Sequence, residues 1–205
     1  MLGLFKKTKA LIVVDVQNDF CPGGALAVPK GDEVVPVING LLGGYDLVVA
    51  TRDWHPRNHC SFAATHRGGK VGERVDLARG SQLLWPVHCV QGTPGAEFAK
   101  GLDKSKFAKV FDKGVDADID SYSGFYDNDR GRSTGLDNFL KEKKVSEVYI
   151  AGLATDYCVR YTALDSVKAG FKTTVLLEGC RGLDVNPGDV DRVLGEMKRA
   201  GVTVK

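Results

Sequence analysis

Short apolar runs alternate along the chain with segments of helical periodicity. Five runs are rich in apolar and β-branched side chains, which is typical of central strands in a parallel sheet that is covered on both faces. These runs lie at residues 9–15, 46–51, 107–113, 148–151 and 172–177. A shorter apolar segment at 202–204 predicts a sixth strand, at the edge of the sheet.

Amphipathic segments between the runs predict four helices. They cover residues 32–42, 134–143, 155–169 and 187–200. Gly152 is expected to end the strand at 148–151, after which Thr155 or Asp156 caps the third helix. Asn186 and Pro187 supply an N-cap and a first-position proline to the fourth helix.

Two polar segments between the predicted elements indicate loops. The Gly-rich, charged stretch 66–80 is expected to form a surface loop, and so is the stretch 117–132, which is rich in Asp, Gly, Ser and Tyr. A turn at 92–95 precedes a short predicted helix that includes Glu97 and Phe98. Long loops above a sheet edge often carry functional residues.

The regular alternation of strand and helix predicts an α/β fold. We expect a three-layer sandwich in which a central, mostly parallel six-stranded sheet has helices on both faces. The chain has 205 residues, of which 43% are hydrophobic, and this is enough to bury a core. Residues 1–205 are therefore expected to form a single domain.

Charge and composition argue against several classes of protein. The formal net charge is +2, and basic residues are not clustered beyond three lysines near the start, so neither nucleic-acid nor membrane-surface binding is expected. The apolar runs are far shorter than the roughly 20 residues that cross a bilayer. Residues 1–7 lack the features of a signal peptide. Five cysteines without CxxC spacing predict a reduced, cytoplasmic protein.

Cys158 lies in the first turn of the third predicted helix. Backbone N–H groups point outward there, and the positive end of the helix dipole favours a thiolate, so this thiol is expected to ionise nearer neutral pH than a free cysteine. The same N–H groups can hold the oxyanion that forms when a thiolate attacks a carbonyl. The alternative is that Cys158 is simply a small buried apolar residue.

Two charged residues stand at the carboxyl ends of predicted strands. Asp15 ends the run 9–15, and Lys113 ends the run 107–113. Ligands of open α/β sheets bind at this edge, so both side chains are candidates for a functional cleft. The alternatives are that Asp15 caps a turn and that Lys113 is an ordinary solvated lysine.

A group of metal-ligand side chains follows the second predicted strand. Asp53, His55 and His59 lie within seven residues, and His88 comes later in the chain. Residues two apart at a strand end point the same way, and the turn after Pro56 can bring His59 round. One carboxylate with imidazoles suits a divalent metal ion. Zinc is the expected ion, and iron and manganese are the alternatives. Turn-capping and surface histidines would give the same pattern.

Four separated segments then carry a resemblance to a known family. They are Asp15-Val-Gln-Asn-Asp-Phe20, Asp53-Trp-His55 with His59 and His88, Lys113, and Gly152-Leu-Ala-Thr-Asp-Tyr-Cys158. In order and spacing the chain closely resembles the nicotinamidases and pyrazinamidases of the isochorismatase-like cysteine hydrolase superfamily. The resemblance extends along nearly the whole chain.

This resemblance implies a role for each segment. Cys158 would be the nucleophile, Asp15 the general base and acid, and Lys113 the cation beside them. The Leu153–Ala154 peptide would be cis, and the N–H groups of Ala154 and Cys158 would form an oxyanion hole. The implied walls of the substrate pocket are Phe20, Trp85 and Tyr122. The implied metal ligands are Asp53, His55, His59 and His88.

The implied reaction is hydrolysis of nicotinamide to nicotinic acid and ammonia through a cysteine thioester, with pyrazinamide as a second substrate. One alternative is a metal-independent hydrolase of the same superfamily that acts on carbamoyl or ureido compounds. Another is a non-catalytic metal-binding protein that has kept the fold. The expected partner is a small-molecule substrate, and the sequence leaves open whether the chain forms a homo-oligomer.

Overall fold

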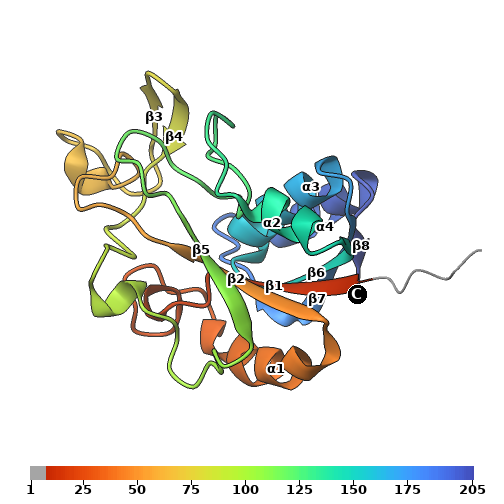
Figure 1. Cartoon of the computed structure of the whole chain (residues 1–205). Coiled ribbons are helices and arrows are strands. Elements are labelled where there is room, and N and C mark those ends of the chain that lie inside the picture. Colours follow the sequence, from red (N-terminus) through yellow and green to blue (C-terminus); the bar gives the residue numbers. More distant parts are fainter. Residues whose placement is uncertain (1–7) are drawn as a thin grey trace, which may run out of the picture.

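A six-stranded, all-parallel sheet forms the centre of the protein in the computed structural model, which describes residues 8–205 (Figure 1). The strand order is β5-β2-β1-β6-β7-β8. The strands are β1 (Thr8–Val14), β2 (Leu47–Asp53), β5 (Phe107–Lys113), β6 (Val145–Leu153), β7 (Lys172–Arg181) and β8 (Thr203–Val204). All six predicted strands are confirmed. The expectation about a signal peptide rests on residues 1–7, which lie outside the described part.

Helices cover both faces of this sheet. One face carries α1 (Val34–Leu41), whereas α2 (Leu136–Glu142), α3 (Arg160–Lys168) and α4 (Asp189–Arg199) lie together on the other (Figure 1). The predicted three-layer α/β sandwich is therefore confirmed.

The apolar runs are continuous because the central strands are buried from both sides. In β1, Ile12 and Val14 belong to the core beneath α2, α3 and α4, whereas Leu11 and Val13 belong to the core beneath α1. All four side chains are completely buried. A central strand of this kind needs apolar residues at successive positions rather than at alternate ones.

The stretch 66–80, predicted to be a loop, contains most of a β-hairpin instead. Strand β3 (Arg74–Leu77) pairs antiparallel with β4 (Gly80–Leu83) in a separate two-stranded sheet (Figure 1). The hairpin projects from the main body, and most of its residues are exposed or only partly buried. Because little of it packs into a core, its sequence lacks the alternation of apolar and polar residues that identifies a half-buried strand.

The junction after β6 differs from the prediction. Gly152 lies inside β6 rather than ending it, and its φ is +133°. There is no space for a side chain at this position, since a Cβ would lie 2.0 Å from the backbone oxygen of Val14. The first helical turn, Thr155–Val159, is a π-helix without a side-chain cap. The Asp156 carboxylate instead accepts hydrogen bonds from backbone N–H groups of the loop after β7.

Two other predicted helix positions are wrong. Helix α4 begins at Asp189 after Gly188 in the left-handed conformation, so Asn186 is not the N-cap. Asn186 donates a hydrogen bond to the Asp189 carboxylate and so stabilises the turn before the helix. The predicted helix around Glu97 is a single 3₁₀ turn, Pro94–Ala96, which ends before it.

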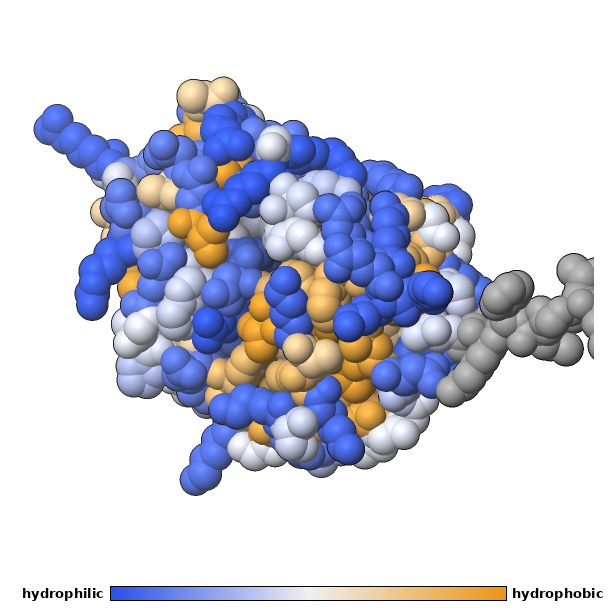
Figure 2. Space-filling model, in the orientation of Figure 1, coloured by the Kyte–Doolittle hydropathy of each residue, from blue (hydrophilic) through white to orange (hydrophobic). Residues whose placement is uncertain are grey.

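Polar side chains cover most of the face shown in Figure 2, and a broad group of apolar side chains lies near its centre, close to the position of β2 and β5 in Figure 1. Exposed apolar side chains are common on folded domains and by themselves identify no partner. Among residues 8–205, no helix combines the length and hydropathy needed to cross a membrane.

Candidate functional site

Four neighbouring strands bring the predicted site residues to one edge of the sheet. Asp15 directly follows β1, and Asp53 and Lys113 are the last residues of β2 and β5, where they pair in register. Cys158 lies in the π-helical turn after β6. Because these strands are parallel neighbours, their carboxyl ends meet, and this is where open α/β sheets bind ligands.

The Lys113 ammonium group connects these residues. It is 1% exposed, and its Nζ lies 2.9 Å from Asp15 Oδ2 and 3.3 Å from Cys158 Sγ. It also donates hydrogen bonds to the Asp53 carboxylate and to the backbone oxygen of Ser121. A single buried cation therefore pairs with two carboxylates and faces the thiol. The alternative that Lys113 is a solvated surface lysine is excluded.

Asp15 has the environment of a general base. It is completely buried, and burial raises the pKa of its carboxyl to about 6, although the Lys113 charge and the Thr51 hydrogen bond oppose the rise. The Thr51 hydroxyl donates to Oδ1 at 2.7 Å. Oδ2 forms an ion pair with Lys113 that lacks hydrogen-bond alignment, so a lone pair remains for another proton. A carboxyl with a pKa near 6 can both take and return a proton at neutral pH.

The expectation that the Cys158 thiol ionises near neutral pH is wrong for the resting site. Burial raises the pKa of this thiol well above its usual value, and Asp15 and Asp53 raise it further, while Lys113 lowers it. The sequence argument counted the helix dipole and omitted the cost of burying a thiolate beside two carboxylates. The thiol therefore rests protonated, and its proton must pass to a base when the sulfur reacts.

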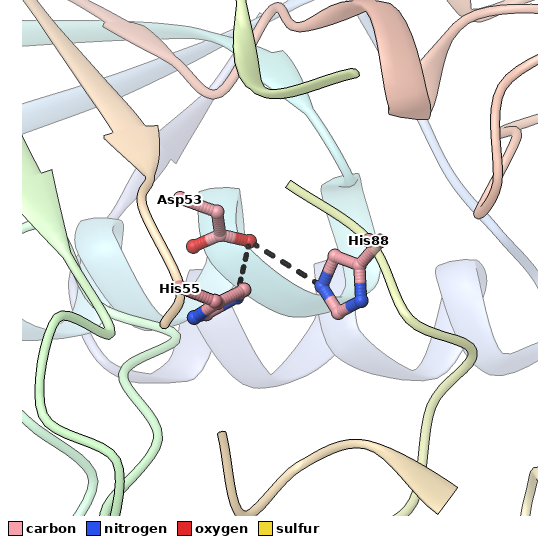
Figure 3. Close-up of side chains that lie close together, drawn as sticks. All are labelled: Asp53, His55 and His88. Carbon is pink, nitrogen blue, oxygen red and sulfur yellow. Dashed lines mark ion pairs between the residues drawn. The ribbon is translucent and has the colours of Figure 1, made fainter. Parts of the chain in front are cut away.

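Asp53, His55 and His88 form a second group next to Lys113. The Asp53 carboxylate points between the two imidazoles, with Oδ2 3.6 Å from His55 Nε2 and 3.8 Å from His88 Nε2 (Figure 3). All three side chains are buried. Their donor atoms lie within 4.8 Å of one another, which is close enough to share a single ion.

The surroundings of this group suit a divalent metal ion. Nδ1 of His55 is 2.8 Å from the Gly114 backbone oxygen, and Nδ1 of His88 is 2.8 Å from that of Pro86. Carbonyl partners of this kind hold the proton on Nδ1 and leave Nε2 free to bind a metal. Burial and the neighbouring His55 also lower the pKa of His88 to about 4, so its ring is neutral at neutral pH. The residues present therefore fit the predicted cofactor.

His59 lies beside this group but in a different arrangement. Its ring stacks on that of His55, with the centroids 4.1 Å apart. Its donor atoms group with those of His55 and the buried Asp120 rather than with Asp53 and His88. Its Nδ1 is 2.7 Å from the Ser61 hydroxyl oxygen. The structure therefore brings His59 next to the predicted metal ligands but does not direct it into the Asp53, His55 and His88 group.

A small pocket opens above Cys158. The three predicted walls, Phe20, Trp85 and Tyr122, all line it, and it offers only about 30 Å³ of space to water. Trp85 Nε1 donates a hydrogen bond to the Tyr122 hydroxyl at 3.0 Å, which fixes both rings. The pocket is therefore small, and aromatic side chains form much of its wall.

The predicted backbone features also lie at this pocket. The Leu153–Ala154 peptide is cis, as the resemblance implied. Ala154 lines the pocket together with Cys158, Asp53 and His88. The thiol, the metal-ligand group and the candidate oxyanion hole therefore face the same space.

Sequence reasoning missed several residues of the site. Thr51 lies two positions before Asp53 on the same strand face, so the alternation of side chains could have identified it. Asp120 also lines the pocket, beside Tyr157 of the segment Gly152–Cys158 that carries the resemblance. Gln17 holds the end of β2, because its side chain bonds both the N–H and the carbonyl oxygen of Asp53. Nothing in the sequence alone indicated Asp120 or Gln17, since their partners come from distant segments.

A comparison with protein families decides the classification. The isochorismatase domain family matches residues 9–205, which is nearly the whole chain. The chain belongs to the isochorismatase family. Its similar relatives include the nicotinamidase of Acinetobacter baylyi, 48% identical over 94% of this chain and 90% of the relative. The nicotinamidase of Escherichia coli is 44% identical over 96% of this chain and 93% of its own length.

Solved structures of the isochorismatase family have the same fold. The nicotinamidase/pyrazinamidase of Acinetobacter baumanii superposes with a TM-score of 0.93 at 48% identity, over 97% of this chain and 95% of the other. The yeast nicotinamidase bound to the inhibitor nicotinaldehyde superposes with a TM-score of 0.91 at 37% identity, over 96% of this chain and 99% of the other. The pyrazinamidase of Pyrococcus horikoshii in complex with zinc superposes with a TM-score of 0.78 at 42% identity, over 96% of this chain and 98% of the other.

Proposed function

We propose that this protein is a nicotinamidase, which hydrolyses nicotinamide to nicotinic acid and ammonia. The observation that carries this proposal is the Lys113 ammonium group, which joins Asp15 and Cys158 at the floor of the aromatic pocket. Hydrolysis of an amide by a thiol needs a nucleophile, a base and a positive field at one place. The nicotinamidase relatives support the choice of substrate.

In the first half of the proposed reaction, Asp15 removes the proton from Cys158 as the sulfur attacks the carboxamide carbon. Lys113 stabilises the thiolate, since its Nζ is 3.3 Å from the sulfur. The backbone N–H groups of Ala154 and Cys158 hold the oxyanion. Asp15 then donates its proton to the leaving nitrogen, ammonia departs, and a thioester remains.

In the second half, Asp15 is again a carboxylate and removes a proton from water. The water oxygen attacks the thioester carbon, and the same N–H groups hold the second oxyanion. Collapse of this intermediate breaks the carbon–sulfur bond, the Cys158 thiolate recovers the proton from Asp15, and nicotinic acid is released. One carboxyl with a pKa near neutrality serves both halves as base and acid.

The proposed metal ligands are Asp53, His55, His59 and His88, and the proposed ion is zinc, with iron or manganese as alternatives. Such an ion would supply a Lewis-acidic contact for the ring nitrogen of the substrate. The zinc-bound pyrazinamidase supports this choice. The metal-independent carbamoyl or ureido hydrolase is not favoured, because Asp53 and His88, which group with His55, line the same pocket as Cys158.

Phe20, Trp85 and Tyr122 are proposed to hold the pyridine ring between their side chains. A pocket of this kind fits pyrazinamide as well, since the pyrazine ring of pyrazinamide differs from the pyridine ring of nicotinamide only by one nitrogen in place of a CH group. We further infer that residues 1–205 form one hydrolase domain, because β1 lies inside the same sheet whose edge is β8. The five free cysteines support a cytoplasmic location.

Removal of the metal is expected to abolish nicotinamide hydrolysis. Dialysis against a chelator should lower ammonia release at least about 100-fold, because ring positioning by the ion would be lost. Restoring one equivalent of zinc, iron or manganese in turn should recover the activity and rank the three ions. Full activity with far less than one metal ion per chain, checked by elemental analysis, would contradict the metal assignment.

Activity is expected to fall when the pH drops through about 6. The pKa of Asp15 is raised to about 6, so the carboxylate that acts as base is present above this pH and lost below it. The ratio kcat/KM for nicotinamide should fall about tenfold per pH unit on the acid side. The ratio should be measured from pH 4.5 to 8 at saturating metal, with structure monitored by circular dichroism. A flat profile down to pH 4.5 in folded enzyme would exclude Asp15 as the base.

A further inference from the structure

A second, larger cavity lies beside the catalytic pocket. It offers about 390 Å³ of space to water, which is within the usual range for small-molecule sites and about thirteen times that of the catalytic pocket. Its walls come from the β3–β4 hairpin, the 117–132 loop, the π-helical turn Thr155–Val159, helix α3 and the first turn of α4. The two cavities share Tyr122 and Tyr157, so these rings separate them.

Most acidic side chains of this outer cavity are already bound. Asp165 pairs with Arg130 at 2.5 Å, and Asp189 pairs with Arg192 at 2.7 Å. Asp156 accepts two backbone hydrogen bonds, at 3.0 and 2.8 Å. These three carboxylates are therefore not available to bind a cationic ligand.

Two arginines of the cavity keep unused donors. Within residues 8–205, no hydrogen bond or ion pair engages the guanidinium group of Arg74 on β3. Arg160 lines the cavity and is held in place by Glu196, 2.7 Å away, and by the Tyr161 ring, whereas its Nε is buried and has no hydrogen-bond partner in the described chain. Guanidinium groups are suited to phosphate and carboxylate, and the exposed Arg74 side chain lines the cavity with its N–H donors unengaged by the described residues. The cavity therefore favours an anion.

Apart from Lys168, which pairs with Asp165 at 3.7 Å, the rest of the lining is mostly aromatic or polar. Tyr122 and Tyr161 stack with their centroids 5.2 Å apart, and Tyr157 packs against Tyr122 at 5.6 Å, so tyrosine rings line the side toward the catalytic pocket. Asp127 is 6% exposed, and its Oδ2 has no hydrogen-bond partner among the described residues. Burial raises the pKa of this carboxyl, and its oxygens can accept hydrogen bonds from hydroxyl groups. Ser81 adds a hydroxyl group.

We propose that this outer cavity is a binding site for a nucleoside monophosphate. The base would lie against the tyrosine rings, the ribose hydroxyls would reach the Asp127 and Ser81 side chains, and the phosphate would face Arg74 and Arg160. Aromatic rings bind nucleobases through their flat faces. The inference is independent of the nicotinamidase reaction, because it concerns a separate cavity and is tested by binding alone.

The test is calorimetric titration of the metal-loaded enzyme with adenosine monophosphate, adenosine and inorganic phosphate. We expect one molecule of the monophosphate to bind per chain, at least about tenfold more tightly than either fragment. Arg74→Ser should weaken its binding about tenfold, and Arg74→Glu should abolish it, because the charge is reversed. Arg67→Ser is the matched control, since Arg67 is an exposed arginine of the same segment that does not line the cavity. The Arg67→Ser variant should bind adenosine monophosphate as tightly as the wild type does.

Three results would overturn the proposal. The first is absence of binding at millimolar adenosine monophosphate. The second is equal affinity in Arg74→Ser and the wild type, which would place the ligand elsewhere. The third is phosphate binding as tight as that of the nucleotide, which would indicate a simple cationic patch. Ammonia release from nicotinamide, measured on the same samples, reports separately on the proposed reaction.

Discussion

Cys158→Ala is expected to lower kcat for ammonia release from nicotinamide by about 10⁴-fold or more. Without the sulfur no thioester can form, and Asp15 and Lys113 have no nucleophile to activate. The aromatic walls and the proposed metal ligands are unchanged, so the variant should still bind nicotinamide and one metal ion per chain. Steady-state kinetics, elemental analysis and nicotinamide titration measure these three quantities.

Cys60→Ala is the matched control for this experiment. Cys60 is half-buried, forms no disulfide and does not line the catalytic pocket. Its replacement should leave kcat within about twofold of the wild type, as expected for a substitution outside the site. Near-wild-type turnover in a folded Cys158→Ala enzyme would rule out the thioester mechanism.

Lys113→Met is expected to damage both activity and stability. Lys113 contacts both Asp15 and Asp53, and its loss leaves two buried carboxylates facing each other without the cation that pairs with both. Breaking a buried pair in this way costs about 3–5 kcal/mol of unfolding free energy. The pKa of Asp15 should rise further, because the Lys113 charge now lowers it, and the acid limb of the pH profile should move to higher pH.

Urea unfolding of the chelated protein measures this stability, since a bound metal ion would neutralise part of the Asp53 charge. Lys109→Met is the matched control on the same strand. Lys109 is exposed, and its Nζ lies over the rings of Phe111 and Phe139, so its loss should cost less than about 1 kcal/mol. Equal stabilities of the two variants would show that the buried ammonium group does not hold the two carboxylates together.

The stability effect can be separated from the kinetic one by a second substitution. Asp53→Asn removes one of the two opposed charges, so adding it to Lys113→Met should recover part of the lost unfolding free energy. Turnover should not recover, because the cation beside Cys158 is still absent. If the second substitution destabilised the protein further, charge repulsion would not be the cause of the first loss.

The fold was accessible from the sequence because its central strands are buried on both faces. Such strands need apolar side chains at every position, and β1 shows this continuous pattern from residue 10 to 14. The β3–β4 hairpin could not be found in the same way. It is mostly exposed, so its pairing depends on contacts with distant loops, such as Arg79 with Asp129, and leaves no periodic pattern.

The ends of the strands were equally informative about the site. Asp15, Asp53 and Lys113 each stand where an apolar run stops, and parallel neighbours bring such ends together. The sequence therefore determined which side chains would meet at the sheet edge, and the family resemblance implied what they do.

Only the tertiary structure decided their charge states and partners. Burial keeps the Cys158 thiol protonated and raises the pKa of Asp15, and neither effect can be calculated before the surrounding groups are placed. The grouping of His59 with Asp120, and the outer cavity that Arg74 lines, likewise join segments far apart in the chain. Desolvation and Coulomb interactions depend on distances in three dimensions, and a linear sequence carries no record of those distances.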